Sequence, residues 1–119
     1  MFRLINKNTK IIYYNYEELG FKLIPTEKSY KILSTDNKDV TNEYIVSVST
    51  NLTDDKGRKL YTEDRVDFNT MDSHFCFGTI KYDGSFYILT NNSQHIPLSN
   101  AINIHLSEYY DDGISGLYL

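Results

Sequence analysis

Short strand-like runs, in which apolar and polar residues alternate, follow one another along most of the chain. Residues 44–49 and 102–107 alternate most clearly, which is typical of strands buried on one side only. Further strand-prone runs lie at residues 2–5, 11–14, 21–24 and 30–33. No segment has the spacing of a long amphipathic helix, and residues 16–19 predict at most one helical turn, ended by Gly20.

The strongest local signal is the Asp83-Gly84 pair between two strand-prone arms, residues 75–82 and 85–89. Asp-Gly favours a two-residue type I′ turn, so we expect Tyr82 to pair with Ser85 and Ile80 with Tyr87. In this register both faces carry apolar residues, so one would pack in the core and the other would meet the first lobe or a partner. The predicted faces are Cys76, Gly78, Ile80, Tyr82, Ser85, Tyr87 and Leu89 on one side, and Phe75, Phe77, Thr79, Lys81, Phe86 and Ile88 on the other.

These runs predict a mainly β fold in a single domain of two lobes. Residues 1–42 would form a small N-terminal β lobe, and residues 43–119 a small antiparallel β-barrel or curled sheet. At most short helical turns are expected. A chain of 119 residues has room for one domain with a modest core.

Composition narrows the function classes. A formal net charge of −4 argues against a protein that binds duplex DNA by neutralising phosphates. Cys76 is the only cysteine, so an internal disulfide is impossible and a reducing cytoplasm is the expected location. No apolar run approaches the roughly 18 residues of a membrane span, so no membrane association is expected.

Candidate catalytic and metal-binding residues are sparse. Asp72, His74 and Cys76 form the only cluster of mixed ligand types, and on a strand they would point to one face. A second pair of ligands is missing, so we expect a loop-to-strand junction with Cys76 buried. A Gly-rich phosphate loop is also absent. We therefore expect no catalytic residues, no metal and no cofactor.

Residues 50–66 read as a polar turn, an apolar step at Leu60 and Tyr61, and entry into a strand at Val66. This segment resembles the signature of the phage YopX family, T-G-L-K-D-K-N-G-K-E-I-Y-E-G-D-I-V. Residues 2–13 are similar to the family's opening, F-R-A-W-D-K-E-N-K-K-M-I-Y, and residues 78–87 to its hairpin, G-V-V-x-Y-x-x-G-S-F-Y. Residues 102–110 resemble its closing strand and short acidic tail. The resemblance implies a phage or prophage origin, a β-rich fold and self-association, and it brings no catalytic residues.

Two residues of the signature segment depart from the family pattern, because Asn51 and Glu63 stand where glycines are usual. Asn tolerates a positive φ, so Asn51 can keep the turn geometry. Glu adopts a positive φ less easily. We therefore expect the turn before Val66 to differ from the family's or to be stabilised in another way.

The first functional hypothesis is a non-enzymatic phage protein that binds a host or phage protein in the bacterial cytoplasm and modulates its activity. An anti-CRISPR or other anti-defence inhibitor is its specific form, because an acidic face could compete with DNA for a basic groove. The alternative for the same residues is a solvated acidic surface without a steering role. The candidate contact residues are Asp54, Asp55, Tyr61, Glu63, Asp64 and Asp67.

The alternative function is an oligomeric small-barrel protein that binds nucleic acid or serves in assembly. Lys7 and Lys10 would contact phosphates, while Tyr13, Tyr14 and Tyr16 would stack on bases. A half-buried Tyr cluster beneath a mixed surface explains the same residues. In an assembly role, exposed strand edges would pair between subunits.

Overall fold

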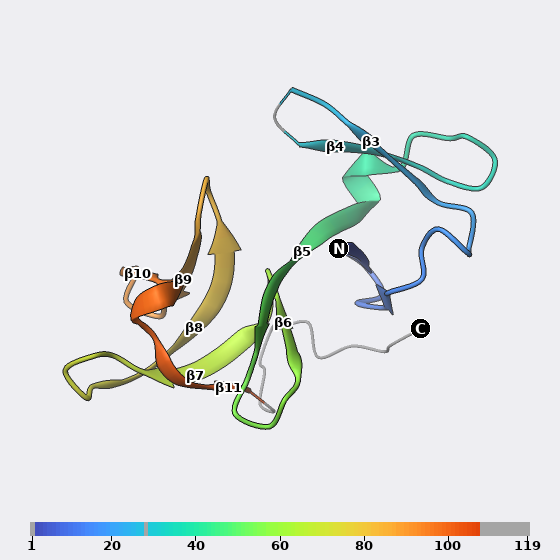
Figure 1. The fold of residues 1–119 in the computed structure, drawn as a ribbon. Coiled ribbons are helices and arrows are strands. Elements are labelled where there is room, and N and C mark those ends of the chain that lie inside the picture. The colour runs from blue at the N-terminus through green and yellow to red at the C-terminus, as the bar shows by residue number, and fades with distance from the viewer. Residues whose placement is uncertain (1, 28, 108–119) are drawn as a thin grey trace. The chain divides into compact units, whose positions relative to one another are not determined.

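The computed structural model describes residues 2–27 and 29–107 and is mainly β, as the sequence predicts (Figure 1). Its helical elements in this part of the chain are two 3₁₀ turns, η1 (Thr41–Glu43) and η2 (Leu98–Asn100). The chain divides into two compact units between Val48 and Ser49. The predicted lobe boundary, between residues 42 and 43, precedes this division. The end of the second predicted lobe, including the acidic tail of the 102–110 resemblance, lies outside the described residues.

The first unit contains two small antiparallel β arrangements. β1 (Phe2–Asn6) pairs with β2 (Ile12–Tyr13) and with the first half of β5 (Tyr44–Thr53). β3 (Lys22–Pro25) and β4 (Tyr30–Leu33) form a separate hairpin. Leu4, Tyr16 and Ile32 form the buried core of this unit.

The second unit is built on a curled five-stranded antiparallel sheet with the order β10-β9-β8-β7-β11. Its strands are β7 (Arg65–Asn69), β8 (Phe75–Tyr82), β9 (Phe86–Thr90), β10 (His95–Pro97) and β11 (Ile102–Leu106). β6 (Lys59–Tyr61) pairs with the second half of β5. The core of the unit consists of Leu60, Val66, Phe68, Ile80, Ile88 and Leu98.

The β8–β9 hairpin forms as predicted, but its predicted register is wrong by one residue. Tyr82 pairs with Phe86 and Ile80 pairs with Ile88, so the loop holds three residues with Gly84 at φ +77°. This register places Ile80 and Ile88 together, and both side chains are fully buried. The predicted register would have placed Ile88 on the opposite face, away from Ile80. A one-residue shift in register moves every side chain of a strand to the other face, so the two-residue turn would have taken Ile88 out of the core. Burial of Ile88 in the core therefore outweighed the Asp-Gly preference for a two-residue turn.

The corrected register defines two faces of the β8–β9 hairpin. The core face carries Gly78, Ile80, Phe86, Ile88 and Thr90, while the outer face carries the alternate residues. Gly78 allows close approach to β9, since a Cβ at this position would lie 2.4 Å from the Leu89 carbonyl oxygen. None of the helices in the described part of the chain is long and apolar enough to cross a membrane.

Candidate functional site

The Asp54 carboxylate is the centre of the turn in the signature segment. Its Oδ1 accepts hydrogen bonds from the backbone amides of Lys56 at 3.0 Å and Arg58 at 2.8 Å. Its Oδ2 accepts a bond from Arg58 Nε at 2.8 Å and another from the Leu106 amide at 3.0 Å. The side chain of Asp54 has no exposed surface. Asp54 thus joins the turn to β11.

Burial alone would raise the pKa of Asp54, but hydrogen bonding reverses this effect. The amides of Leu106, Arg58 and Lys56 and the side chain of Arg58 all donate to the charged carboxylate, and together they lower its pKa to about 2. A carboxylate that accepts several such bonds is held in its ionised form. Asp54 is therefore charged at neutral pH, and both of its carboxylate oxygens accept hydrogen bonds within the fold.

Two neighbours of Asp54 also contact β11. Arg58 Nη2 donates to the Leu106 carbonyl at 3.0 Å, and the Asp55 amide donates to the Ile104 carbonyl at 2.9 Å. The Asp55 side chain is half exposed, and its Oδ1 lies 2.9 Å from His105 Nδ1. The turn is thus attached to the last strand through both backbone and side chains.

Asp54, Asp55 and His105 bring three ligand atoms within 4.8 Å of one another, the spacing of a metal site. The four hydrogen bonds to Asp54 already occupy the lone pairs of both oxygens. The Arg58 guanidinium also lies 3.5 Å from His105 Nδ1, where its charge opposes a cation. Only two ligands remain, so this cluster does not fit a metal ion.

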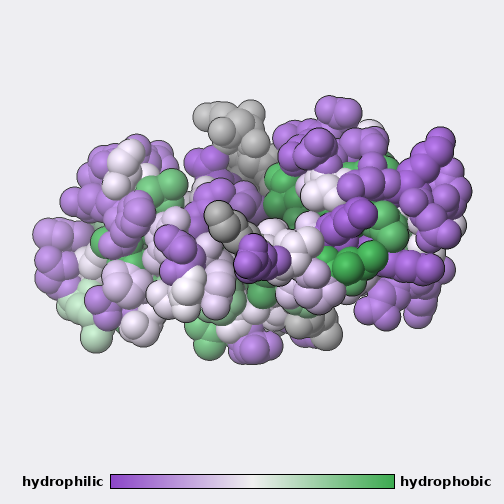
Figure 2. Space-filling model, turned by 90° about the horizontal axis from the view of Figure 1, so that it is seen from above, coloured by the Kyte–Doolittle hydropathy of each residue, from purple (hydrophilic) through white to green (hydrophobic). Residues whose placement is uncertain are grey.

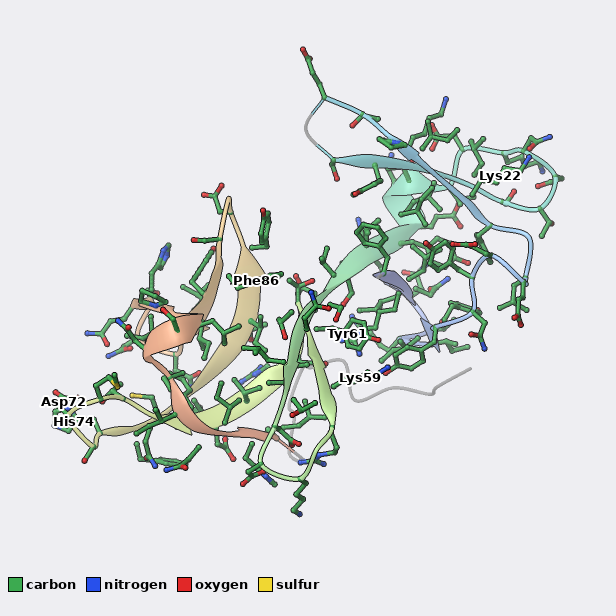
Figure 3. The ribbon with its side chains drawn as sticks, in the orientation of Figure 1. Lys22, Lys59, Tyr61, Asp72, His74 and Phe86 are labelled. Atoms are coloured by element: carbon green, nitrogen blue, oxygen red, sulfur yellow. The ribbon has the colours of Figure 1, made fainter. Side chains whose placement is uncertain are left out.

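The sequence-derived cluster of Asp72, His74 and Cys76 does not form a site. Asp72 and His74 lie at the tip of the exposed loop between β7 and β8, with His74 Nδ1 3.3 Å from Asp72 Oδ2 (Figure 3). Cys76 instead packs half-buried against the core, opposite Phe68. The predicted alternation fails because β8 begins only at Phe75, after Asp72 and His74. The predicted loop-to-strand junction is present, but Cys76 is half-buried and not buried as predicted.

The second half of the signature segment forms a turn around Glu63, which has a φ of +75°. The Tyr61 amide donates to Asp64 Oδ2 at 2.8 Å, and the Glu63 amide donates to the Ile80 carbonyl at 2.9 Å. Lys81 Nζ lies 3.0 Å from both carboxylate oxygens of Glu63. The expected alternative stabilisation is therefore an ion pair from β8. Asn51 has a positive φ of +63°, as predicted, but it lies within β5, where the pairing with β6 shifts register, and not in a turn.

The six predicted acidic-surface residues do not form one exposed surface. Asp54, Tyr61 and Asp64 are buried, with relative exposures of 6%, 3% and 5%. The prediction that these three residues contact a partner directly is wrong, because they are buried. The carboxylates of Asp54 and Asp64 instead accept hydrogen bonds from backbone amides of the turns. Of the others, Asp55 lies beside His105, Glu63 is paired with Lys81, and Asp67 is half-buried on β7.

The tyrosines predicted to bind nucleic acid make side-chain contacts within the first unit. The Tyr13 ring packs against Phe21 and Tyr44 with centroids 5.9 and 6.0 Å apart, and its burial raises its pKa. Tyr16 belongs to the buried core, and the Tyr14 hydroxyl accepts a bond from Arg3 Nη1 at 3.2 Å. Lys7 and Lys10 are exposed. The predicted base-stacking role of Tyr16 is wrong because its ring is buried, whereas Tyr13 and Tyr14 are half-buried and their roles stay predictions.

A different feature stands out on the outer face of the five-stranded sheet. Phe75 and Phe77 lie on this face of β8 with relative exposures of 68% and 46%. Met71, in the preceding loop, is 71% exposed, and Ile102 on β11 is 41% exposed. We call these four residues the aromatic face. Apolar side chains also reach the surface among hydrophilic ones in the space-filling view (Figure 2).

Sheet register places polar residues among these apolar ones. Asn69 lies between Phe75 and Ile102, and Asp67 pairs with Phe77 on one side and His105 on the other. Alternation along β8 had already placed Phe75 and Phe77 on one side of the strand. Their exposure could not be read from the sequence, because apolar residues line both sides of this hairpin.

Comparison of the chain with models of protein families, with curated proteins and with solved structures gave no match.

Proposed function

We propose that this chain is a non-enzymatic accessory protein, encoded by a phage or prophage, that binds a host or phage protein and modulates its activity. The single observation that carries the proposal is the aromatic face, with Phe75 and Met71 about two-thirds exposed or more. Large apolar side chains gathered on one surface mark interaction sites in soluble proteins. The similarity of residues 50–66, 2–13 and 78–87 to YopX motifs supports the phage origin and membership of that family.

The aromatic face could contribute substantially to binding. A Phe side chain that loses about 100 Å² of apolar surface to a partner contributes roughly 2.5 kcal/mol. Both Phe75 and Phe77 have a large exposed fraction from which to make such a contribution. Phe residues are also enriched in the cores of protein–protein interfaces. These two rings are therefore the proposed anchors, with Ile102 on the same face of the sheet and Met71 in the loop that precedes β8.

The charge of this surface suggests the chemistry of the partner. Asp67 lies beside Phe77, and Asp72 lies in the loop that precedes Phe75. A partner that presents apolar side chains next to Lys or Arg would match both the rings and the carboxylates. The proposed acidic contact therefore consists of Asp67, which was already among the predicted contact residues, and Asp72. It no longer includes the buried Asp54 and Asp64. An anti-CRISPR or anti-defence inhibitor acting on a DNA-handling protein is the specific form of the proposal.

The test compares three tagged proteins expressed in a host that carries the phage or prophage. The wild type, a Phe75→Ser/Phe77→Ser variant and a Leu52→Ser control are purified, and the captured proteins are identified by mass spectrometry. Leu52 is a suitable control because it is 47% exposed and lies outside the aromatic face. We expect the wild type and the control to retain the same partner and the double variant to lose it. Equal capture by all three proteins would refute the role of the aromatic face, and capture by none would contradict the proposed function.

A further inference from the structure

β11 is an edge strand of the five-stranded sheet, and edge strands carry backbone groups without a neighbouring strand. The Ser107 amide donates to the Arg65 carbonyl of β7 at 2.8 Å, and His105 pairs with Asp67. Because backbone groups alternate in direction along a strand, those of Ile104 and Leu106 point away from β7. This outward side is where a further strand would add.

The outward groups of β11 are already bonded to the turn at residues 54–58. The Ile104 carbonyl accepts from the Asp55 amide at 2.9 Å. The Leu106 amide donates to Asp54 Oδ2 at 3.0 Å, and the Leu106 carbonyl accepts from Arg58 Nη2 at 3.0 Å. Thus a carboxylate stands in for a strand carbonyl, and a guanidinium stands in for a strand amide.

We infer that Asp54 and Arg58 form an edge cap that prevents a second copy of this chain from adding a strand to β11. The two side chains are joined to each other by the 2.8 Å contact between Arg58 Nε and Asp54 Oδ2, so they act as one unit. The Asp54 side chain is wholly buried, which excludes a competing strand from its position. The role of these residues is therefore protective, and it is separate from the partner binding proposed for the aromatic face.

The opposite edge of the sheet has a different protection. β10 contains only the residues His95–Pro97, and proline has no amide hydrogen to donate to a neighbouring strand. Short edge strands and proline are both devices that reduce strand addition. The edge cap thus protects the longer edge strand of this sheet, and its removal would expose a strand-pairing site.

The inference is tested with an Asp54→Ala/Arg58→Ala variant and a fluorescent peptide of residues 101–107. This peptide carries the sequence of β11 and stands for the strand of a second copy. We expect the variant to bind the peptide in an anisotropy titration, and the wild type to show no binding. In native-state hydrogen exchange, the Leu106 amide should exchange roughly tenfold or more faster in the variant, since it loses a bond to a charged acceptor. An Asp83→Ala/Lys22→Ala variant removes one negative and one positive charge from exposed residues outside the hairpin that forms the edge cap, and should behave as the wild type.

A folded double variant that fails to bind the peptide and keeps the wild-type exchange rate at Leu106 would overturn the inference. If circular dichroism shows that the double variant is unfolded, Arg58→Ala alone decides the question. This single variant keeps the bond between Asp54 and the Leu106 amide but uncovers the Leu106 carbonyl, so we expect weaker but measurable peptide binding. Absence of binding by a folded Arg58→Ala variant would equally overturn it.

Discussion

The turn at Glu63 provides a sharp test of how this fold accommodates a residue in an unfavourable conformation. Glu63 has a φ of +75°, where an L side chain is strained, and Lys81 holds its carboxylate with two contacts of 3.0 Å. Two replacements separate the strain from the ion pair. Glu63→Ala removes the ion pair and keeps the strain, whereas Glu63→Gly removes both.

The free energies of these terms predict an unusual order of stability. The left-handed conformation costs an L residue about 1–2 kcal/mol. The Glu63 side chain is about three-quarters buried and the Lys81 side chain about two-thirds buried, so we expect their ion pair to stabilise the fold by about 1 kcal/mol. A glycine at this position lowers the free energy of unfolding by about 0.5–1 kcal/mol, because it gives the unfolded chain more conformational freedom. Glu63→Ala should therefore lower the free energy of unfolding by about 1 kcal/mol, and Glu63→Gly by clearly less.

Urea unfolding of the wild type and both variants measures these differences, with the m-value checked for constancy. A Lys81→Met variant and the Glu63→Ala/Lys81→Met double variant complete a cycle that isolates the ion pair. In most positions of a folded chain, alanine is at least as stabilising as glycine. An alanine variant as stable as the glycine variant, or more stable, would refute the reasoning about strain at Glu63.

Three further predictions address other parts of the second unit. Asp54→Asn should lower the free energy of unfolding by about 2 kcal/mol at neutral pH, because the pKa of Asp54 is lowered from 3.8 to about 2 in the fold. This difference in stability from the wild type should persist above pH 4 and narrow as pH falls toward 2. Urea titrations at several pH values would detect it. Gly78→Ala should destabilise the fold more than Gly57→Ala, because a Cβ at Gly78 meets the Leu89 carbonyl oxygen at 2.4 Å, whereas a Cβ at Gly57 meets no atom within 4 Å. Gly57→Ala is then expected to cost only the about 1–2 kcal/mol of an L residue at its φ of +80°, and equal melting temperatures would contradict this. Asp67→Asn should weaken binding of a captured basic partner mainly at low salt, with stability changed by less than about 0.5 kcal/mol; an unchanged salt dependence would count against an acidic contact.

Much of the strand order could be predicted because local alternation and core burial agree. Residues 2–5 and 30–33 fall within or coincide with β1 and β4, and the alternating residues 44–49 begin β5. The positive φ of Asn51 was also predictable, since Asn is one of the few residues that tolerate it. In these places one local rule is sufficient and no distant residue opposes it.

Prediction failed where a distant contact decided the outcome. The Asp83-Gly84 pair favours a two-residue turn, but pairing Ile80 with Ile88 buries both residues, and only the folded sheet reveals that preference. Asp54 likewise reads as a solvated acid in the sequence. Its burial depends on the Leu106 amide, 52 residues further along the chain, which no local pattern connects to it.

The division between the two compact units falls inside β5, between Val48 and Ser49, within a continuous strand. Val48 pairs with Phe2 on one side of this point, and Ser49 pairs with Tyr61 on the other. A protease needs several residues of extended, accessible chain, and a strand bonded along its length does not supply them. Limited proteolysis should therefore nick exposed loops, such as residues 35–38 and 71–74, before it separates the units. Genetic truncation at residue 48 or 49 should yield fragments that each lack half of a strand, so two-fragment complementation is the more suitable way to dissect this protein.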